Sequence, residues 1–596
     1  MEKAAIYHRP ESEMAYLAGK NQFRIRLRTK HADVHQVEII YGRLDRIKQQ
    51  KLAADSEEDM EIIRPNVEAM QCILKTDLYD YWEITIPVKV RERTQYLFHL
   101  IGDHDGELLY DAVNVRLYMA DFLEKATPFN TPYYQNMFLM HSNPEWTKHT
   151  VWYQIMLDRF ADGDENNEPL EKARWDLDKS TATNFYGGDL QGVIDHLDYL
   201  DELGINGIKL SPIFASYSNQ KNDPVDFYDL SYMFGSKELF REFVQKAHQR
   251  GMRVMVQLPL DRMSDMALQW QDVQRLGAQS WFASWFKVRQ FPVQIPNENE
   301  DPDKYYLTID GNIHMPKLNL QSPTVQQYLL ETARYWIETF DIDGWEILNA
   351  DEVDQTFLNL MTQQMHSIKA DFVVMGQYQY LPNGDLAKDY IDSANNVDFY
   401  TIMHDFFITH QLNVTEMISR INDALMKNTV YTNQTLINEV ESFGTPRLIS
   451  ECNGEEDLAR AIIAFTFMQI GIPSFMYGTE VGVTGEDVPT NLAPMKWKDE
   501  DQSSSMLQFM KNAIAMRREY ADLLNDGTLE WGQLSNKYRY FTLTREYDGQ
   551  KLFCLFNFGY GSVKVVIPQN SEIVLSQNLM EDENKIAQNG FVILKV

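Results

Sequence analysis

Short apolar segments alternate with amphipathic helical segments from about Val151 onward, and this alternation limits the fold more than any other feature. In the clearest unit, the apolar residues between positions 190 and 203 recur at helical spacing and form one face. Gly204 can end that helix in a left-handed conformation, and Ile205 to Leu210 follow as an apolar strand.

Two further units repeat the pattern. A helix is predicted from Lys237 to Arg250, followed by the strand Arg253 to Leu258, and another is predicted to begin at Ser322. Repeated strand–helix units pack as a parallel sheet covered by helices. The repeated unit therefore predicts an α/β fold built on a barrel of parallel strands surrounded by helices.

Both ends of the chain alternate instead with the strand period of two. We predict an N-terminal β-sandwich over residues 1–125, the barrel over 126–520 and a C-terminal β-sandwich over 521–596. The polar stretch 263–319 is too long for an ordinary barrel loop, so we expect an inserted subdomain after the third strand.

The formal net charge of −32 disfavours nucleic acid and anionic membrane surfaces as partners. The start of the chain lacks a secretory signal pattern, and no long apolar run is present, which predicts a cytoplasmic protein. Cys72, Cys452 and Cys554 show no metal-ligand spacing and are predicted to be buried free thiols.

Many ordered segments resemble the α-amylase superfamily of glycoside hydrolases, and most closely its neopullulanase, cyclomaltodextrinase and maltogenic amylase subgroup. The segments that carry this resemblance are Ala5–Pro10, Val151–Ile155, Asn184–Val193, Gly204–Phe214, Met315–Asn319, Asp343–Trp345, Glu352–Asp354, Gly471–Gly478 with Glu480 and Gly482, and Pro494–Trp497. The resemblance implies a starch-binding-like N-terminal domain that takes part in dimerisation, a catalytic (β/α)8 TIM barrel with an insertion after its third strand, and a C-terminal sandwich.

A retaining glycosidase needs a carboxylate nucleophile and a second carboxyl group as acid and base, about 5 Å apart. In the family motifs these groups, and a third carboxylate, follow the fourth, fifth and seventh barrel strands. By that alignment Leu348 stands at the nucleophile position, Gln377 at the general acid position and Gly444 at the third carboxylate position. The resemblance thus predicts that the family's catalytic residues are replaced.

Neighbouring positions also differ from the family motifs: Gln257, Arg262, Glu346 and Phe443 replace a carboxylate, a histidine, an arginine and a histidine. A glutamate in a buried strand needs a partner for its charge. We therefore expect Arg262 to pair with Glu346, and Leu348 and Phe443 to fill part of the former sugar pocket.

These substitutions predict a catalytically inactive homologue with a binding or assembly role in α-glucan metabolism. The expected partners are a second copy bound through the N-terminal domain, an active relative, or a maltooligosaccharide. The alternatives are an α-glucan hydrolase or transglycosylase that uses displaced carboxylates such as Asp261, Glu346 and Glu441, and a purely structural subunit.

The resemblance also implies a structural Ca2+ site near the first barrel strand. Six oxygen donors would suit this ion. They come from Asp162, Asp164, Asn167, Glu168, the Gly187 carbonyl and Asp189.

Overall fold

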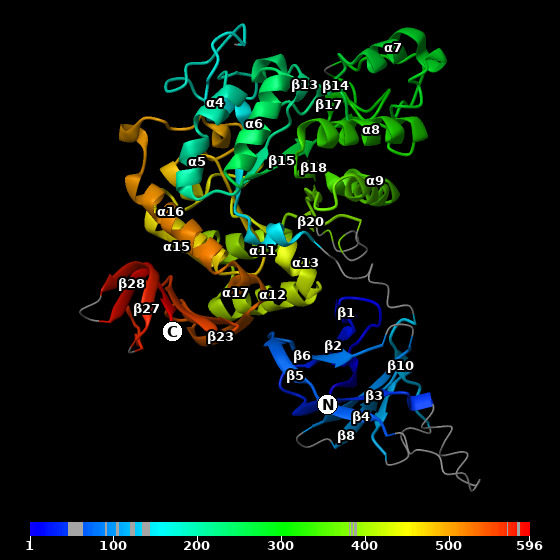
Figure 1. The fold of residues 1–596 in the computed structure, drawn as a ribbon, viewed down its shortest axis with the longest axis vertical. Coiled ribbons are helices and arrows are strands. Elements are labelled where there is room, and N and C mark those ends of the chain that lie inside the picture. The colour runs from blue at the N-terminus through cyan, green and yellow to red at the C-terminus, as the bar shows by residue number, and fades with distance from the viewer. Residues whose placement is uncertain are drawn as a thin grey trace. The chain divides into compact units, whose positions relative to one another are not determined.

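The computed structural model of the 596-residue chain describes all residues except 46–63, 90–91, 103–105, 120–124, 134–142, 168, 298, 381, 383–385, 387–389, 569 and 581–583. The chain forms two compact units: residues 1–142 with 415–433, and residues 143–414 with 434–596 (Figure 1). Among the described residues, no helix combines the length and apolar character needed to cross a membrane.

The first unit contains two antiparallel sheets that enclose an apolar core. One has the order β1 (Ala15–Gly19), β2 (Gln22–Lys30), β6 (Tyr79–Pro87) and β5 (Gln71–Lys75). The other has the order β4 (Asn66–Ala69), β3 (Gln36–Gly42), β7 (Gln95–Ile101), β8 (Glu107–Tyr110) and β9 (Val115–Leu117), and β10 (Phe129–Asn130) pairs with β7. This arrangement confirms the predicted N-terminal sandwich.

Arg26 departs from the simple alternation of buried and exposed residues along β2. It is 1% exposed and contacts the segment 415–433 of the same unit, which includes most of helix α12 (Val414–Met426). Its guanidinium contacts Glu83 at 2.8 Å and the Asn428 carbonyl at 2.7 Å. These contacts compensate the buried charge of Arg26, a residue that the alternating pattern of β2 predicts to be exposed to solvent.

The second unit is built on an eight-stranded parallel sheet, which confirms the predicted TIM barrel. In chain order its strands are β11 (Trp152–Ile155), β12 (Gly207–Leu210), β15 (Arg253–Leu258), β18 (Gly344–Ile347), β19 (Val373–Gly376), β20 (Ser393–Ala394), β21 (Ile437–Asn438) and β22 (Ile472–Met476). A parallel bridge between Asn395 and Ile437 joins its two edges.

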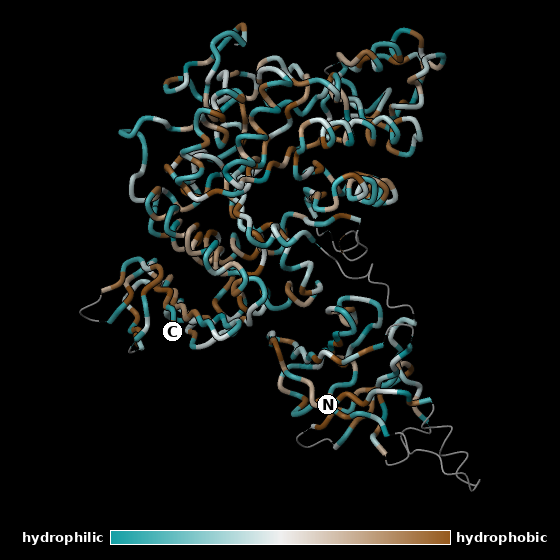
Figure 2. Tube along the Cα trace, in the orientation of Figure 1, coloured by the Kyte–Doolittle hydropathy of each residue, from teal (hydrophilic) through white to brown (hydrophobic). Residues whose placement is uncertain are grey.

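Helices surround the barrel strands, as Figure 1 shows, and Figure 2 shows hydrophobic and hydrophilic residues interspersed along them. They include α4 (Leu190–Asp195), α5 (Leu197–Leu203), α6 (Lys237–Gln249), α8 (Pro323–Phe340), α9 (Gln355–Ile368), α11 (Val397–Met403), α15 (Glu456–Phe467) and α16 (Ser504–Glu519). The single helix expected before Gly204 is interrupted at His196, while Gly204 adopts the expected left-handed cap with φ of 94°.

Between β15 and α8 the chain forms α7 (Leu268–Leu276) and the short hairpin β16 (Thr308–Ile309) with β17 (Asn312–Pro316). The C-terminal domain is one sheet in the order β23 (Thr528–Ser535), β24 (Tyr540–Tyr547), β25 (Gln550–Asn557), β28 (Lys585–Lys595) and β26 (Val563–Lys564), with β27 (Glu572–Met580) also paired to β28. All three cysteines are free, and Cys72 is only partly buried.

Candidate active site

The carboxyl ends of the barrel strands are where enzymes of this architecture carry their chemistry. Leu348 directly follows β18 and is 7% exposed, and its N–H donates to the Leu258 carbonyl at 3.1 Å. Gln377 directly follows the neighbouring strand β19, and its N–H donates to the Ile347 carbonyl at 2.8 Å. The structure therefore places these two predicted site positions on adjacent strand ends.

Gly444 and Phe443 lie in the loop that follows β21. Gly444 is exposed, and a Cβ atom at this position would meet no heavy atom within 4 Å. Phe443 is half-buried, and its carbonyl accepts from Asn491 at 3.0 Å. Of the two side chains expected to fill the former pocket, Leu348 is thus the more deeply buried.

Glu346 does not pair with Arg262, so that prediction is wrong. The Glu346 carboxylate accepts from the Lys209 ammonium at 2.9 Å and from the Gln257 amide at 2.7 Å. The Arg262 guanidinium instead contacts the neighbouring carboxylate of Asp261 at 2.7 Å. Lys209 lies on β12 and reaches Glu346 through the barrel interior, so it satisfies this buried charge.

A second carboxylate, Glu439, joins this interior group directly after β21. It accepts from the Gln154 amide at 2.7 Å, and that amide also lies 2.8 Å from the Ser474 hydroxyl. Burial raises the pKa of Glu439; Lys209 opposes this effect, and the charge of Glu346 adds to it. Glu439 is therefore easier to protonate than an exposed glutamate, while Glu346 has a cation beside it.

Lys209, Gln154 and Glu439 were not predicted as members of this group. A signal was available, because Lys209 interrupts the apolar strand Ile205–Leu210 and Glu346 interrupts another buried strand. Opposite charges in two buried strands of one barrel are expected to pair, since each would otherwise bear a large desolvation cost.

Glu441 and Asp261, the other carboxylates considered for a displaced site, are fixed by nearby donors. Glu441 accepts from the Leu448 N–H at 2.6 Å, lies 3.3 Å from the Arg447 guanidinium and also accepts from the Thr479 hydroxyl. Asp261 is fully buried beside Arg262. Both have a guanidinium partner in the folded protein.

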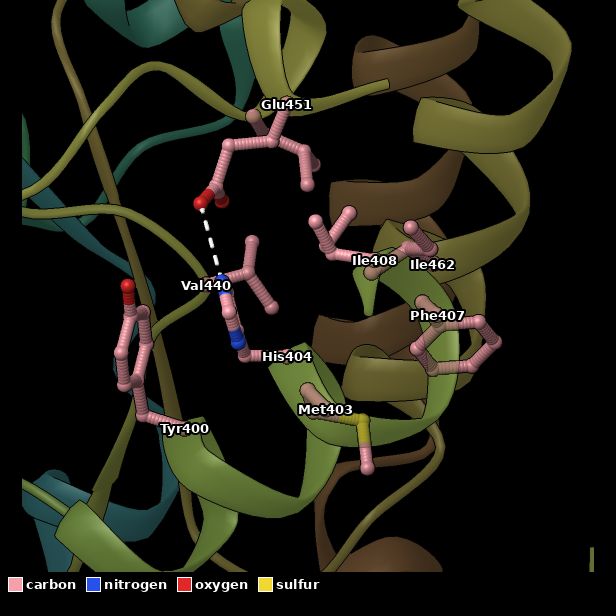
Figure 3. Close-up of a pocket in the computed structure, with 9 residues that line it drawn as sticks. Tyr400, Met403, His404, Phe407, Ile408, Val440, Glu451 and Ile462 are labelled. Carbon is pink, nitrogen blue, oxygen red and sulfur yellow. Dashed lines mark ion pairs between the residues drawn. The ribbon is translucent and has the colours of Figure 1, made fainter. Parts of the chain in front are cut away.

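A small pocket lies beside these strand ends, between α11 with its continuation (His404–Ile408) and α14 (Leu448–Glu451). It encloses about 230 Å3 of free space, part of it open to solvent. Figure 3 shows the Glu451 carboxylate and the His404 ring pointing toward each other, with Tyr400 beside them and apolar side chains opposite. The Glu451–His404 distance is 3.5 Å, and burial, helped by the charge of Glu441, raises the pKa of Glu451 to about 7.

The loop expected to bind calcium follows the first barrel strand. The Asp189 carboxylate caps α4 through the Gly192 N–H at 2.7 Å and accepts from the Asn167 amide at 2.8 Å. Asp162 pairs with Lys172, and Asp164 accepts from the Asn166 side chain at 2.7 Å. The remaining expected ligands are the Gly187 carbonyl, in a left-handed turn with φ of 83°, and Glu168, which lies outside the described residues.

Comparisons with known proteins agree with this architecture. Residues 154–522 match the family described as alpha amylase, catalytic domain, and residues 1–135 match alpha amylase, N-terminal ig-like domain. The chain is 37% identical over 566 residues to an intracellular maltogenic amylase of Bacillus subtilis strain 168, covering 94% of this chain and 92% of that protein. It is 32% identical over 567 residues to a cyclomaltodextrinase of Thermoanaerobacter pseudethanolicus, with the same coverages of 94% and 92%. A solved cyclomaltodextrinase structure superposes with a TM-score of 0.87 at 26% identity and covers 100% of this chain and 98% of that one.

These relatives correct the expectation of an inactive homologue. Proteins that match nearly the whole chain are named as amylases and cyclomaltodextrinases, which favours the alternative of an active α-glucan hydrolase. The assignment of the replaced positions 348, 377 and 444 remains a prediction. The match of the catalytic-domain family to most of the chain and the likeness over its full length lead to one conclusion: this chain belongs to the alpha-amylase family.

Proposed function

We propose that this protein hydrolyses or transfers α-glucosidic bonds in short α-glucans, using carboxylates displaced from the family positions. Leucine, glutamine and glycine cannot supply the nucleophile, the acid and the third carboxylate. The observation that carries the proposal is that Glu346 contacts Lys209 at 2.9 Å inside the barrel, and that Glu439, also buried, lies near enough for both charges to affect its pKa. One carboxyl has a pKa raised by burial and the other is paired with a cation, which matches the division of roles that acid catalysis with a second carboxylate requires.

In this proposal Glu439 donates its proton to the glycosidic oxygen as the bond from that oxygen to C1 breaks. The Glu346 carboxylate attacks C1 and forms a glycosyl ester. Glu439 then removes a proton from water, or from the hydroxyl of a second sugar, which attacks C1 and releases Glu346. Each step conserves atoms and charge, and both residues return to their starting states.

The mechanism requires that a sugar reach two deeply buried carboxylates. Glu439 is 8% exposed and Glu346 is 1% exposed. Side chains alternate along a strand, so Leu348 lies on the same side as Glu346, one layer nearer the carboxyl end. The sugar can reach Glu346 only when this layer opens.

The test is the release of sugars from cyclomaltodextrin, maltotriose and pullulan, measured by product chromatography on protein made in a host that lacks amylases. We expect turnover by the unaltered protein and a loss of at least about 100-fold in Glu439→Gln and Glu346→Gln. The matched control is Glu352→Gln, because Glu352 is an exposed carboxylate near the same end of β18.

Two outcomes would contradict the proposal. The first is the absence of product with all three substrates. The second is turnover that persists at the original rate in both glutamine variants. Circular dichroism of each variant separates a lost reaction from a lost fold.

We also propose that the protein works inside the cell as a homodimer formed through its N-terminal domain. The intracellular location is supported by the name of the Bacillus subtilis relative, and the dimer by the match of residues 1–135 to the N-terminal domain of the family. Light scattering at micromolar concentration is expected to give twice the chain mass of 69.7 kDa. A monomeric mass would contradict the dimer.

A further inference from the structure

The loop predicted to bind calcium already satisfies its carboxylates with donors from the protein. Asp189 shows this most clearly: one of its oxygens accepts from the N–H groups of Gly163 at 3.1 Å and Gly192 at 2.7 Å. The other accepts from the Asp164 N–H at 2.9 Å and the Asn167 amide at 2.8 Å. A carboxylate offers about four lone-pair sites, so these donors fill Asp189.

Asp162 and Asp164 are engaged as well. The Asp164 Oδ1 atom accepts from the N–H of Asn166 at 3.0 Å and from its side-chain amide at 2.7 Å. Asp162 forms an ion pair with the ammonium of Lys172. Each carboxylate assigned to calcium on the described part of the loop therefore has a nitrogen donor.

Lys172 lies among the expected ligands. Its Nζ atom would be 3.4 Å, and its Cε atom 3.0 Å, from a Cβ atom built on Gly187. The ammonium thus lies beside the Gly187 turn while it contacts Asp162, so it occupies the region between two of the predicted ligands. A divalent ion in the same region would be repelled by this charge.

One oxygen atom of the loop is still available as a ligand for a cation. Asn167 Oδ1 is buried and has no hydrogen-bond partner among the described residues. A calcium site needs six to eight oxygen ligands, and the described donors offer this amide oxygen and the Gly187 carbonyl beyond the occupied carboxylates. The donor set therefore does not fit calcium while Lys172 is in place.

We infer that the Lys172 ammonium replaces the family's calcium ion as the cation that holds the loop from Asp162 to Asp189 against the barrel. The amine carries one positive charge and three N–H donors, which suits Asp162 and the backbone oxygens near the Gly187 turn. The loop then keeps its conformation without an added metal. Removing the ammonium frees the Asp162 carboxylate, which together with the Asn167 amide oxygen, the Gly187 carbonyl and water molecules offers a weak site for a divalent ion.

The test compares the full-length protein with Lys172→Met, which keeps most of the side-chain length but removes the charge. Thermal melting is recorded in EDTA and in CaCl2, and calcium binding is measured by titration calorimetry. For the unaltered protein we expect the same Tm in both solutions and no binding heat. For Lys172→Met we expect a Tm several degrees lower in EDTA and a partial recovery in CaCl2.

Lys179→Met is the matched control, because Lys179 is an exposed lysine of the same segment. It should melt like the unaltered protein in both solutions. Lys172→Gln provides a second variant if Lys172→Met fails to fold. The inference is overturned if the unaltered protein binds one calcium ion, or if the folded Lys172 variant melts without any response to calcium.

Discussion

The Lys209 ammonium lies 2.9 Å from the Glu346 carboxylate inside the barrel, and the two side chains are only 3% and 2% exposed. Their strands, β12 and β18, are not neighbours, because β15 lies between them in the sheet. The contact therefore crosses the barrel interior above β15, where Gln257 donates to the second oxygen of Glu346. This buried pair links strands that share no backbone hydrogen bonds.

Removing the cation of this pair should destabilise the barrel strongly. In Lys209→Met the Glu346 charge stays buried without its cation and keeps the hydrogen bond from the Gln257 amide, so we expect a loss of about 3–5 kcal/mol in the free energy of unfolding. The double variant Lys209→Met/Glu346→Leu should recover most of this loss, because it removes the uncompensated charge. Urea unfolding followed by tryptophan fluorescence measures both effects.

An exposed ion pair provides the control for that experiment. Lys246 pairs with Glu242 at 2.8 Å on the surface of α6, with side chains 40% and 52% exposed. Lys246→Met should change the free energy of unfolding by less than about 1 kcal/mol. Equal losses in the two lysine variants would contradict a special role for the interior pair.

The barrel could be predicted from the sequence because its signals are local. The apolar spacing before Gly204 and the strand after it fix one strand–helix unit, and repetition of the unit implies the closed sheet. The break at His196 was missed because the apolar spacing continues across it. Apolar periodicity shows which face of a helical segment is buried. It does not show whether the segment forms one continuous helix.

The charge partners could not be predicted in the same way. The order of the strands led to the prediction that Arg262 contacts Glu346. In the structure the Arg262 guanidinium instead pairs with the neighbouring Asp261 carboxylate at 2.7 Å. Lys209 meets Glu346 only because the barrel curves, so that non-adjacent strands point side chains at one another. Contacts across a closed barrel depend on the closed geometry, which no local pattern contains.

The two predicted carboxylate positions should respond differently to an introduced acid. Gly444→Asp should leave Tm nearly unchanged, because a Cβ atom there meets open space and the residue is exposed. Leu348→Asp should lower Tm and should not raise the rate of glucan hydrolysis, because it buries a second carboxylate near Glu346. Melting curves and product chromatography on both variants check this. A faster reaction in Leu348→Asp alone would show that position 348 still holds the family's nucleophile site.

Glu451 should make the protein less stable as the pH rises from acidic to neutral. Burial and the charge of Glu441 raise its pKa from 4.5 to about 7 in the folded state. The folded protein therefore retains a proton between these values that the unfolded chain releases, and the free energy of unfolding falls as pH rises from about 4.5 to 7. Glu451→Gln cannot ionise, so it should match the unaltered protein near pH 4.5 and be more stable at pH 8. Thermal melting across this range measures the difference, and a constant difference at every pH would contradict the assignment.

His8 should make the N-terminal unit sensitive to acid. The ring is buried between the Arg26 carbonyl at 2.7 Å and the Tyr96 hydroxyl at 2.8 Å, and burial lowers its pKa from 6.5 to about 4, although the carbonyl contact opposes this. Between these values the unfolded chain binds a proton that the folded ring does not, so stability is full above pH 6.5 and is lost as pH falls toward 4. The loss in the free energy of unfolding should reach about 3 kcal/mol.

Hydrogen exchange of the β2 and β7 amides, corrected for the intrinsic effect of pH, should show protection that falls as the pH drops from 6.5 to 4. His8→Gln keeps both hydrogen-bonding groups without titrating, so its protection should stay level, whereas His314→Gln, which alters a side chain that is 68% exposed, should follow the unaltered protein. Parallel loss of protection in His8→Gln and the unaltered protein would assign the acid sensitivity to other groups.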